Sequence, residues 1–185
     1  MAAPGLTHAF DLTINGPPGF ASEGSSFSNL SAAYGQFPRH ETRRLKPAAD
    51  ALRLVYEGSL KSADGTIEIP LLGGTDWMRL HETYADIDAR VSCATKPGAA
   101  GPQLNCDVSY RGKIAFHGPM KALWAGEKSS LDWHEGYYYT SPVLESRSEQ
   151  LAWVNETVFL GMGKITLTEA GNLQVVYRIF KVHAN

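Results

Sequence analysis

The sequence predicts an all-β protein, specifically a closed antiparallel β-barrel with long irregular loops. Apolar and polar residues alternate with a period of two over most segments, while helical periodicity is scarce. The 18 glycines and 10 prolines are spread along the chain, dividing it into short segments without a βαβ rhythm. Closure into a barrel removes exposed edge strands, and a barrel of about eight strands holds one small ligand.

The alternating segments predict strands along residues 1–185, which we interpret as a single domain, at Leu52–Glu57, Asp86–Cys93, Leu104–Tyr110, Tyr137–Leu144, Leu151–Leu167 and Leu173–Val182. Asp64-Gly65 and Gly171-Asn172 predict hairpin turns. Residues 16–46 are rich in turn formers and predict a long loop or lid, with one short helix near Glu41 to Lys46. Residues 118–136 predict a second irregular stretch.

Charge and hydropathy exclude two classes of partner. The formal net charge is −2, with 17 Lys and Arg against 19 Asp and Glu, and the basic surface that phosphate binding requires is missing. No stretch approaches the roughly 18 consecutive apolar residues of a membrane span, and the first residues lack the pattern of a signal peptide. We therefore expect neither nucleic acid nor membrane as a partner, and a cytoplasmic location.

Cysteine and histidine spacing predicts neither a disulfide scaffold nor a metal centre. Cys93 and Cys106 are interpreted as reduced buried thiols, with a bridge across a hairpin as the alternative. The six histidines are scattered, and no nucleophile elbow, phosphate loop or zinc motif is present. Gly161-Met162-Gly163 indicates a bulge or a close backbone approach. We expect no metal and no cofactor.

Charged residues gather on one face of the predicted strand at 86–93. If Ile87 and Ala89 face the packed side, Asp86, Asp88 and Arg90 share the opposite face. That face is either a solvated exterior with salt bridges or a polar barrel lumen, in which Arg90 sets the ionisation of a carboxylate. The sequence leaves both alternatives open.

Aromatic residues supply a second candidate region. Alternation places Tyr137 and Tyr139 on one face of their strand with Tyr138 on the other, and puts Trp153 and Asn155 on a common face. These aromatics either belong to the core or line a small-molecule pocket that carries a few polar groups.

Taken together, these segments resemble the family known as domain of unknown function 3237, or UPF0311, over most of the chain. The resemblance is carried by Leu12-Thr13-Ile14 with Gly16-Pro17-Pro18, Gly73-Gly74-Thr75-Asp76-Trp77, Asp88-Ala89-Arg90, Tyr139-Thr140-Ser141-Pro142 with Glu145, Ala152-Trp153-Val154-Asn155, and Gly161 and Gly163. It implies a closed barrel like those of calycins and lipocalins, with a central pocket but without one general activity. Fungal members resembling this chain accompany enzymes that make natural products.

By this analogy we expect a cofactor-free enzyme, of the cyclase, isomerase or pericyclase type, acting on a hydrophobic natural-product intermediate bound inside the barrel. Asp88 is expected to act as general acid or base, beside Arg90 and Tyr139 as further catalytic residues. The expected substrate-binding residues are Trp77, Trp153, Asn155 and Glu145. The alternative is a non-catalytic carrier of lipocalin type, and a structural or homodimer-forming role is the third reading.

Overall fold

The computed structural model describes residues 3–16, 49–55, 57–125, 127–167 and 173–184. The predicted loop or lid at 16–46, with its short helix, lies almost entirely outside these residues, as does the predicted turn at Gly171-Asn172. The strands are β1 (Gly5–Asn15), β2 (Ala49–Val55), β3 (Glu57–Ser62), β4 (Glu68–Leu80), β5 (Tyr84–Ala94), β6 (Asn105–Ala115), β7 (Ser130–Leu131), β8 (Tyr138–Glu145), β9 (Phe159–Leu167) and β10 (Leu173–His183).

The strands form a closed antiparallel barrel, as the sequence predicts. Neighbours follow the order β10-β1-β3-β4-β5-β6-β8-β9, and β9 pairs with β10 to close the ring of eight. Strand β2 pairs with the second half of β4 and β3 with the first half, so the two share one place in the ring. Closure pairs the strands of the ring on both sides, except that β2 is paired with β4 alone in the described part of the chain.

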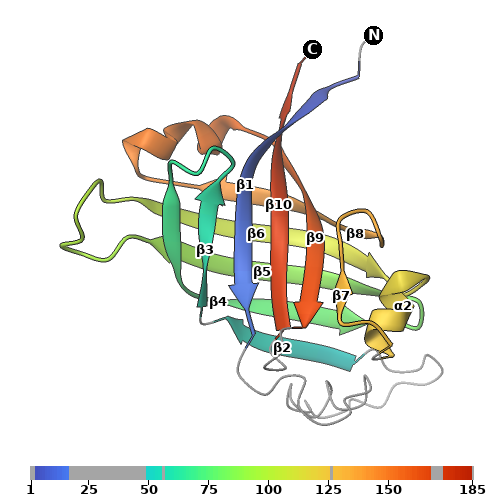
Figure 1. Ribbon diagram of the computed structural model, residues 1–185. Coiled ribbons are helices and arrows are strands. Elements are labelled where there is room, and N and C mark those ends of the chain that lie inside the picture. Colours follow the sequence, from blue (N-terminus) through green and yellow to red (C-terminus); the bar gives the residue numbers. More distant parts are fainter. Residues whose placement is uncertain (1–2, 17–48, 56, 126, 168–172, 185) are drawn as a thin grey trace, which may run out of the picture.

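In Figure 1, β1, β3, β9 and β10 stand upright in front, and β4, β5, β6 and β8 run across behind them. The two termini lie together at the top of this view. The inward side chains of both groups make one apolar core that includes Phe10, Leu12, Leu60, Val108 and Ile179. Because the core lies between crossing strands, each strand has one buried face and one face outside.

Short helical elements pack near the barrel ends. Helix α2 (Pro119–Trp124) lies at the lower right of Figure 1 and buries Met120. The 3-10 helix η1 (Glu149–Glu156) lies at the upper left and buries Leu151 and Val154. The predicted strand 151–167 is therefore wrong in its first part, because residues 149–156 are helical and the strand begins at Phe159.

The predicted irregular stretch at 118–136 also contains regular structure, namely α2 and the short strand β7. The Asp64-Gly65 turn is confirmed: it joins β3 to β4, and Gly65 has a φ of 73°, which glycine adopts without strain. Period-two alternation is confirmed in β5 and β8, whose residues are alternately buried and accessible along most of each strand.

A β-bulge in β4 changes which residues face the interior. Leu71 and Gly73 pair with consecutive residues of β5, so Leu72 is an extra residue and its side chain is 63% exposed. Before the bulge, Leu71 points inward. After it, Asp76 is buried and Trp77 is 43% exposed. If β4 had no bulge and Leu72 counted as a regular strand residue, strict alternation from Leu71 would put Trp77 inside and Asp76 outside.

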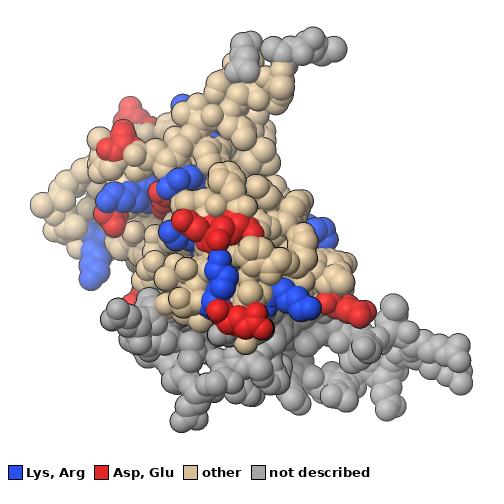
Figure 2. Space-filling view, turned by 45° about the vertical axis from the view of Figure 1, so that its right-hand side comes forward, with Lys and Arg blue, Asp and Glu red and all other residues tan. Residues whose placement is uncertain are grey.

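Acidic and basic side chains lie next to one another, rather than separated by sign, on the face seen in Figure 2. Oppositely charged side chains form surface ion pairs, such as Lys128–Glu135 and Lys164–Asp132. Among the described residues, no helix is long and apolar enough to cross a membrane.

Candidate functional site

Polar side chains from four strands meet in the barrel interior, and we call them the interior polar cluster: Asp76 of β4, Tyr110 of β6, Tyr138 and Thr140 of β8, and Tyr177 of β10. Asp76 is 7% exposed and Thr140 5%, while each of the three tyrosines is at most 3% exposed. Asp76 is the only buried acidic side chain among the described residues. A cluster of this kind is unusual, because apolar groups fill most barrel interiors.

The three tyrosines contact one another. The hydroxyls of Tyr138 and Tyr177 share a short hydrogen bond, and their rings meet edge to face with centroids 5.4 Å apart. The Tyr110 ring lies 4.6 Å from that of Tyr177. Burial raises the pKa of Tyr177 well above its usual value, and the neighbouring Tyr110 and Asp76 raise it further. Tyr177 therefore keeps its proton at any physiological pH and remains a hydrogen-bond donor.

Two glycines of β9 make room for the cluster. A Cβ atom at Gly163 would lie 2.2 Å from the Tyr138 ring, and one at Gly161 would lie 2.3 Å from the Thr140 hydroxyl. Both distances are far below van der Waals contact, so only glycine fits at either position. The close backbone approach predicted for Gly161-Met162-Gly163 is thus confirmed, and it positions Tyr138 and Thr140.

Thr140 contributes to the cluster a hydroxyl that is available for a hydrogen bond with a ligand. Its Oγ1 atom is buried and has no hydrogen-bond partner among the described residues. A buried hydroxyl without a partner costs about 1–3 kcal/mol, so such a group is a candidate to bind a polar atom of a ligand.

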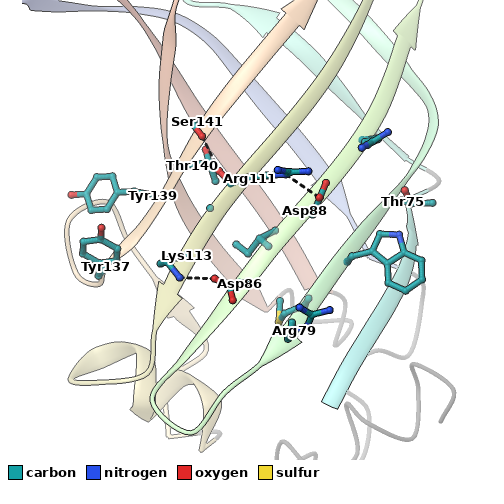
Figure 3. A pocket seen from close by; sticks show the side chains of 15 residues that line it. Thr75, Arg79, Asp86, Asp88, Arg111, Lys113, Tyr137, Tyr139, Thr140 and Ser141 are labelled. Carbon is teal, nitrogen blue, oxygen red and sulfur yellow. Dashed lines mark hydrogen bonds and ion pairs between the residues drawn. The ribbon is translucent and has the colours of Figure 1, made fainter. Parts of the chain in front are cut away.

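A second candidate site lies on the outside of the barrel, across β4, β5, β6 and β8, and we call it the outer groove (Figure 3). It encloses about 990 Å³. Its charged lining residues are Arg79, Asp86, Asp88, Arg90, Arg111 and Lys113, and its aromatic ones are Trp77, Tyr137 and Tyr139. Arginine and lysine therefore outnumber carboxylates in this groove.

Cross-strand ion pairs occupy the carboxylates of the outer groove. Arg111 Nε lies 3.1 Å from Asp88, and Lys113 Nζ lies 2.6 Å from Asp86 (Figure 3). His81 also contacts Asp86, at 2.9 Å. The hydrogen bond from Lys113 lowers the pKa of Asp86 below its usual value.

The structure answers the question that the sequence left open for Asp88 and Arg90. Ile87 and Ala89 are buried, so Asp88 and Arg90 lie on the exterior of β5, with the Asp88 side chain 41% exposed. Tyr139, 41% exposed, shares this exterior. These three residues and Trp77 meet in the outer groove, not in a lumen. Their expected roles in catalysis and binding stay predictions.

The other three predicted residues lie apart from the groove. Trp153 and Asn155 belong to η1 and not to a strand, so the common strand face predicted for them does not exist. The Asn155 amide both accepts from the Ser146 N–H and donates to the Ser146 carbonyl, each at 2.9 Å, which ties η1 to the end of β8. Glu145 is exposed at that same end.

Sequence reasoning assigned no role to the interior polar cluster. Asp76 belongs to the Gly73–Trp77 motif, but strict alternation along β4 predicts that its side chain points outward. The bulge at Leu72 reverses that orientation. Tyr138 carried a usable signal, since alternation already separated it from Tyr137 and Tyr139. Among the described residues, no group of three or more His, Cys, Asp and Glu side chains comes together as a candidate metal centre.

Comparison with known proteins identifies a family. The model of a family described as proteins of unknown function, DUF3237, matches residues 4–182 and confirms the resemblance found in the sequence. No curated protein matches the chain.

Solved structures share the fold at low sequence identity. A conserved protein of unknown function from Rhodopseudomonas palustris is 17% identical, with a TM-score of 0.65 over 98% of this chain and 99% of that one. A β-barrel-like protein from Acinetobacter baumannii is 16% identical, with a TM-score of 0.58 over 98% of both chains. A protein described as an enzyme from Penicillium herquei is 15% identical, with a TM-score of 0.51 over 97% of this chain and 96% of that one.

Proposed function

This chain belongs to the DUF3237 family, whose function is unknown, and we propose that it is an enzyme that moves protons on a hydrophobic small molecule held inside the barrel. The observation that carries the proposal is Asp76, a buried carboxyl group of the interior polar cluster that acts electrostatically on the Tyr177 hydroxyl. Burying a carboxylate costs several kcal/mol. This cost favours a functional role for Asp76 over a purely structural one.

The chemistry that these groups support is proton transfer next to a carbonyl. The Asp76 carboxylate takes a proton from the adjacent carbon, and the electron pair of that C–H bond moves to give an enolate. The Tyr177 hydroxyl, which stays protonated, donates a hydrogen bond to the enolate oxygen, and Thr140 offers a second hydroxyl. A carboxyl base beside tyrosine donors in an apolar site is a known solution for this reaction.

Two outcomes follow from such an enolate. Return of the proton from Asp76 to a different carbon completes an isomerisation. Attack of the enolate carbon on an electrophilic carbon of the same molecule forms a ring, while the proton on Asp76 passes to the oxygen that becomes negative. Cyclase or isomerase activity on natural-product intermediates agrees with the description of the Penicillium herquei neighbour as an enzyme, although the likeness itself concerns the fold.

Exchange of α-protons tests this proposal without knowledge of the natural substrate. The probe is 2-tetralone in D₂O, with loss of its α-proton signals followed by NMR. We expect the protein to accelerate exchange, and Asp76→Asn to slow the catalysed rate by about 10²-fold. Tyr177→Phe keeps the base but removes a donor, and we expect a loss of similar size. Asp107→Asn, an exposed carboxylate on the outside of β6, is the matched control and should leave the rate unchanged.

Three results would overturn the interior assignment. The first is an unchanged rate in both Asp76→Asn and Tyr177→Phe proteins that keep the wild-type circular dichroism spectrum. The second is a loss of rate in Asp88→Asn alone, which would move the chemistry to the outer groove. The third is tight binding of the ketone without any exchange, which would favour the carrier alternative.

A further inference from the structure

Three residues of the outer groove, Thr75, Trp77 and Arg90, form a corner that the interior site does not use. Thr75 and Arg90 are directly paired across β4 and β5, and Trp77 is paired with Asp88, two positions along the same face. Trp77 and Arg90 are therefore diagonal neighbours on the outside of the barrel. At this spacing, about 7–8 Å between Cα atoms, an aromatic ring and a long side chain reach one another.

The guanidinium at this corner is available to a ligand. The Arg90 side chain is exposed, and its guanidinium makes no hydrogen bond or ion pair with a side chain in the described part of the chain. The nearest carboxylates on this face are Asp88, which pairs with Arg111, and Asp107, which accepts a hydrogen bond from the Ser92 hydroxyl. An arginine fork of this kind binds a carboxylate through two parallel hydrogen bonds.

The indole beside it supplies an apolar surface. Trp77 is 43% exposed, although a tryptophan ring gains more from burial than almost any other side chain. A flat ring stacked on the indole would cover that surface. The Thr75 hydroxyl, opposite Arg90, is placed to donate a third hydrogen bond to the same anion.

We infer that this corner, formed by Thr75, Trp77 and Arg90, binds a planar aromatic carboxylate. The ring stacks on Trp77, and the carboxylate accepts two hydrogen bonds from the guanidinium of Arg90. Because both carboxylates of the groove are already paired with Arg111 and Lys113, the positive charge of Arg90 favours an anion over a neutral ring at this corner. The groove volume of about 990 Å³ leaves room for a fused ring system. The inference goes beyond the proposed function and does not depend on it. Thr140 lines the outer groove as well as the interior polar cluster, but none of Thr75, Trp77 and Arg90 belongs to that cluster.

The test is an NMR titration of the full chain with 2-naphthoate, with 2-naphthamide as a neutral probe of the same shape. The signal to follow is the indole N–H of Trp77, identified as the one of four tryptophan signals missing in Trp77→Phe. We expect saturable shifts of the Trp77 signal with 2-naphthoate, and binding of 2-naphthamide at least tenfold weaker. Raising the salt concentration should weaken naphthoate binding.

Matched arginine variants locate the anion. Arg90→Gln should weaken 2-naphthoate at least tenfold, whereas Arg147→Gln, an exposed arginine outside the groove, should change the dissociation constant by less than twofold. Both positions are exposed, so both variants should keep the wild-type spectrum. No saturation by 10 mM naphthoate, equal affinity for naphthamide, or equal losses in the two variants would overturn the inference. The proton exchange of 2-tetralone is measured in a separate experiment. A negative result for naphthoate binding therefore does not affect the proposal for the interior site, and the reverse also holds.

Discussion

The hydroxyl groups of Tyr138 and Tyr177 hydrogen-bond to each other inside the barrel although the residues are 39 positions apart in the sequence. Tyr138 comes from β8 and Tyr177 from β10, and β9 separates these strands in the ring. The bond passes over β9 where Gly163 carries no side chain. This hydrogen bond thus links β8 to β10 across β9, within the interior polar cluster.

Removal of either hydroxyl should destabilise the protein. We expect Tyr138→Phe and Tyr177→Phe each to lower the free energy of unfolding by about 1–3 kcal/mol, because each leaves a buried hydroxyl without its partner. The double variant should lose less than the sum of the single losses. Urea unfolding measures all three, with the exposed Tyr137→Phe as control. Strictly additive losses would show that the two hydroxyls are not coupled.

Gly163→Ala should be among the most damaging single-methyl changes in the chain. The new Cβ would lie 2.2 Å from the Tyr138 ring, and overpacking of this kind costs about 1–3 kcal/mol or more. Thermal unfolding is the measurement, and Leu160→Ala, at a 45% exposed position of the same strand, is the control. If Gly163→Ala does not fold, adding Tyr138→Ala should restore folding; a double variant that stays unfolded contradicts the assigned clash.

The two cysteines should be unreactive in the folded protein. Cys93 and Cys106 face each other across β5 and β6 as free thiols, and burial raises the pKa of each to about 12. Labelling with iodoacetamide at pH 8 should therefore require unfolding. Because the folded-state pKa is raised, the unfolded chain loses these protons first, and stability should fall as the pH rises from about 9 toward 12. Rapid labelling of the native protein would contradict this burial.

Trp153→Ala should reduce stability by about 1–3 kcal/mol, less than the loss for a fully buried ring. The Trp153 ring stacks on Phe10 with centroids 5.6 Å apart and leans on Phe159 at 6.0 Å, so it anchors η1 to the barrel. It is 40% exposed, which limits the loss. Denaturant unfolding tests this effect. The same variant should leave binding of 2-naphthoate unchanged, since Trp153 lies outside the outer groove.

Alternation in the sequence was enough to predict the barrel and the two faces of β5 and β8. It could not predict the inside of β4, because the extra residue Leu72 reverses the alternation halfway along the strand. It also misread residues 149–156, where Leu151 and Val154 are buried with the three-residue spacing of a 3-10 helix. The interior polar cluster depends on contacts between distant strands, which no local pattern contains.

Leu72 also bears on how relatives of this chain are compared with it. At the 14–17% identity of the solved neighbours, very few matches would decide where any one-residue gap near Leu72 is placed. Shifting that gap past Asp76 would align this buried carboxyl group with a solvent-facing residue of the relative, and the indole of Trp77 with an interior one. A family-wide alignment of this segment therefore has to be anchored on the strand pairing of β4 with β5, residue by residue, before any acidic position in it is counted as shared.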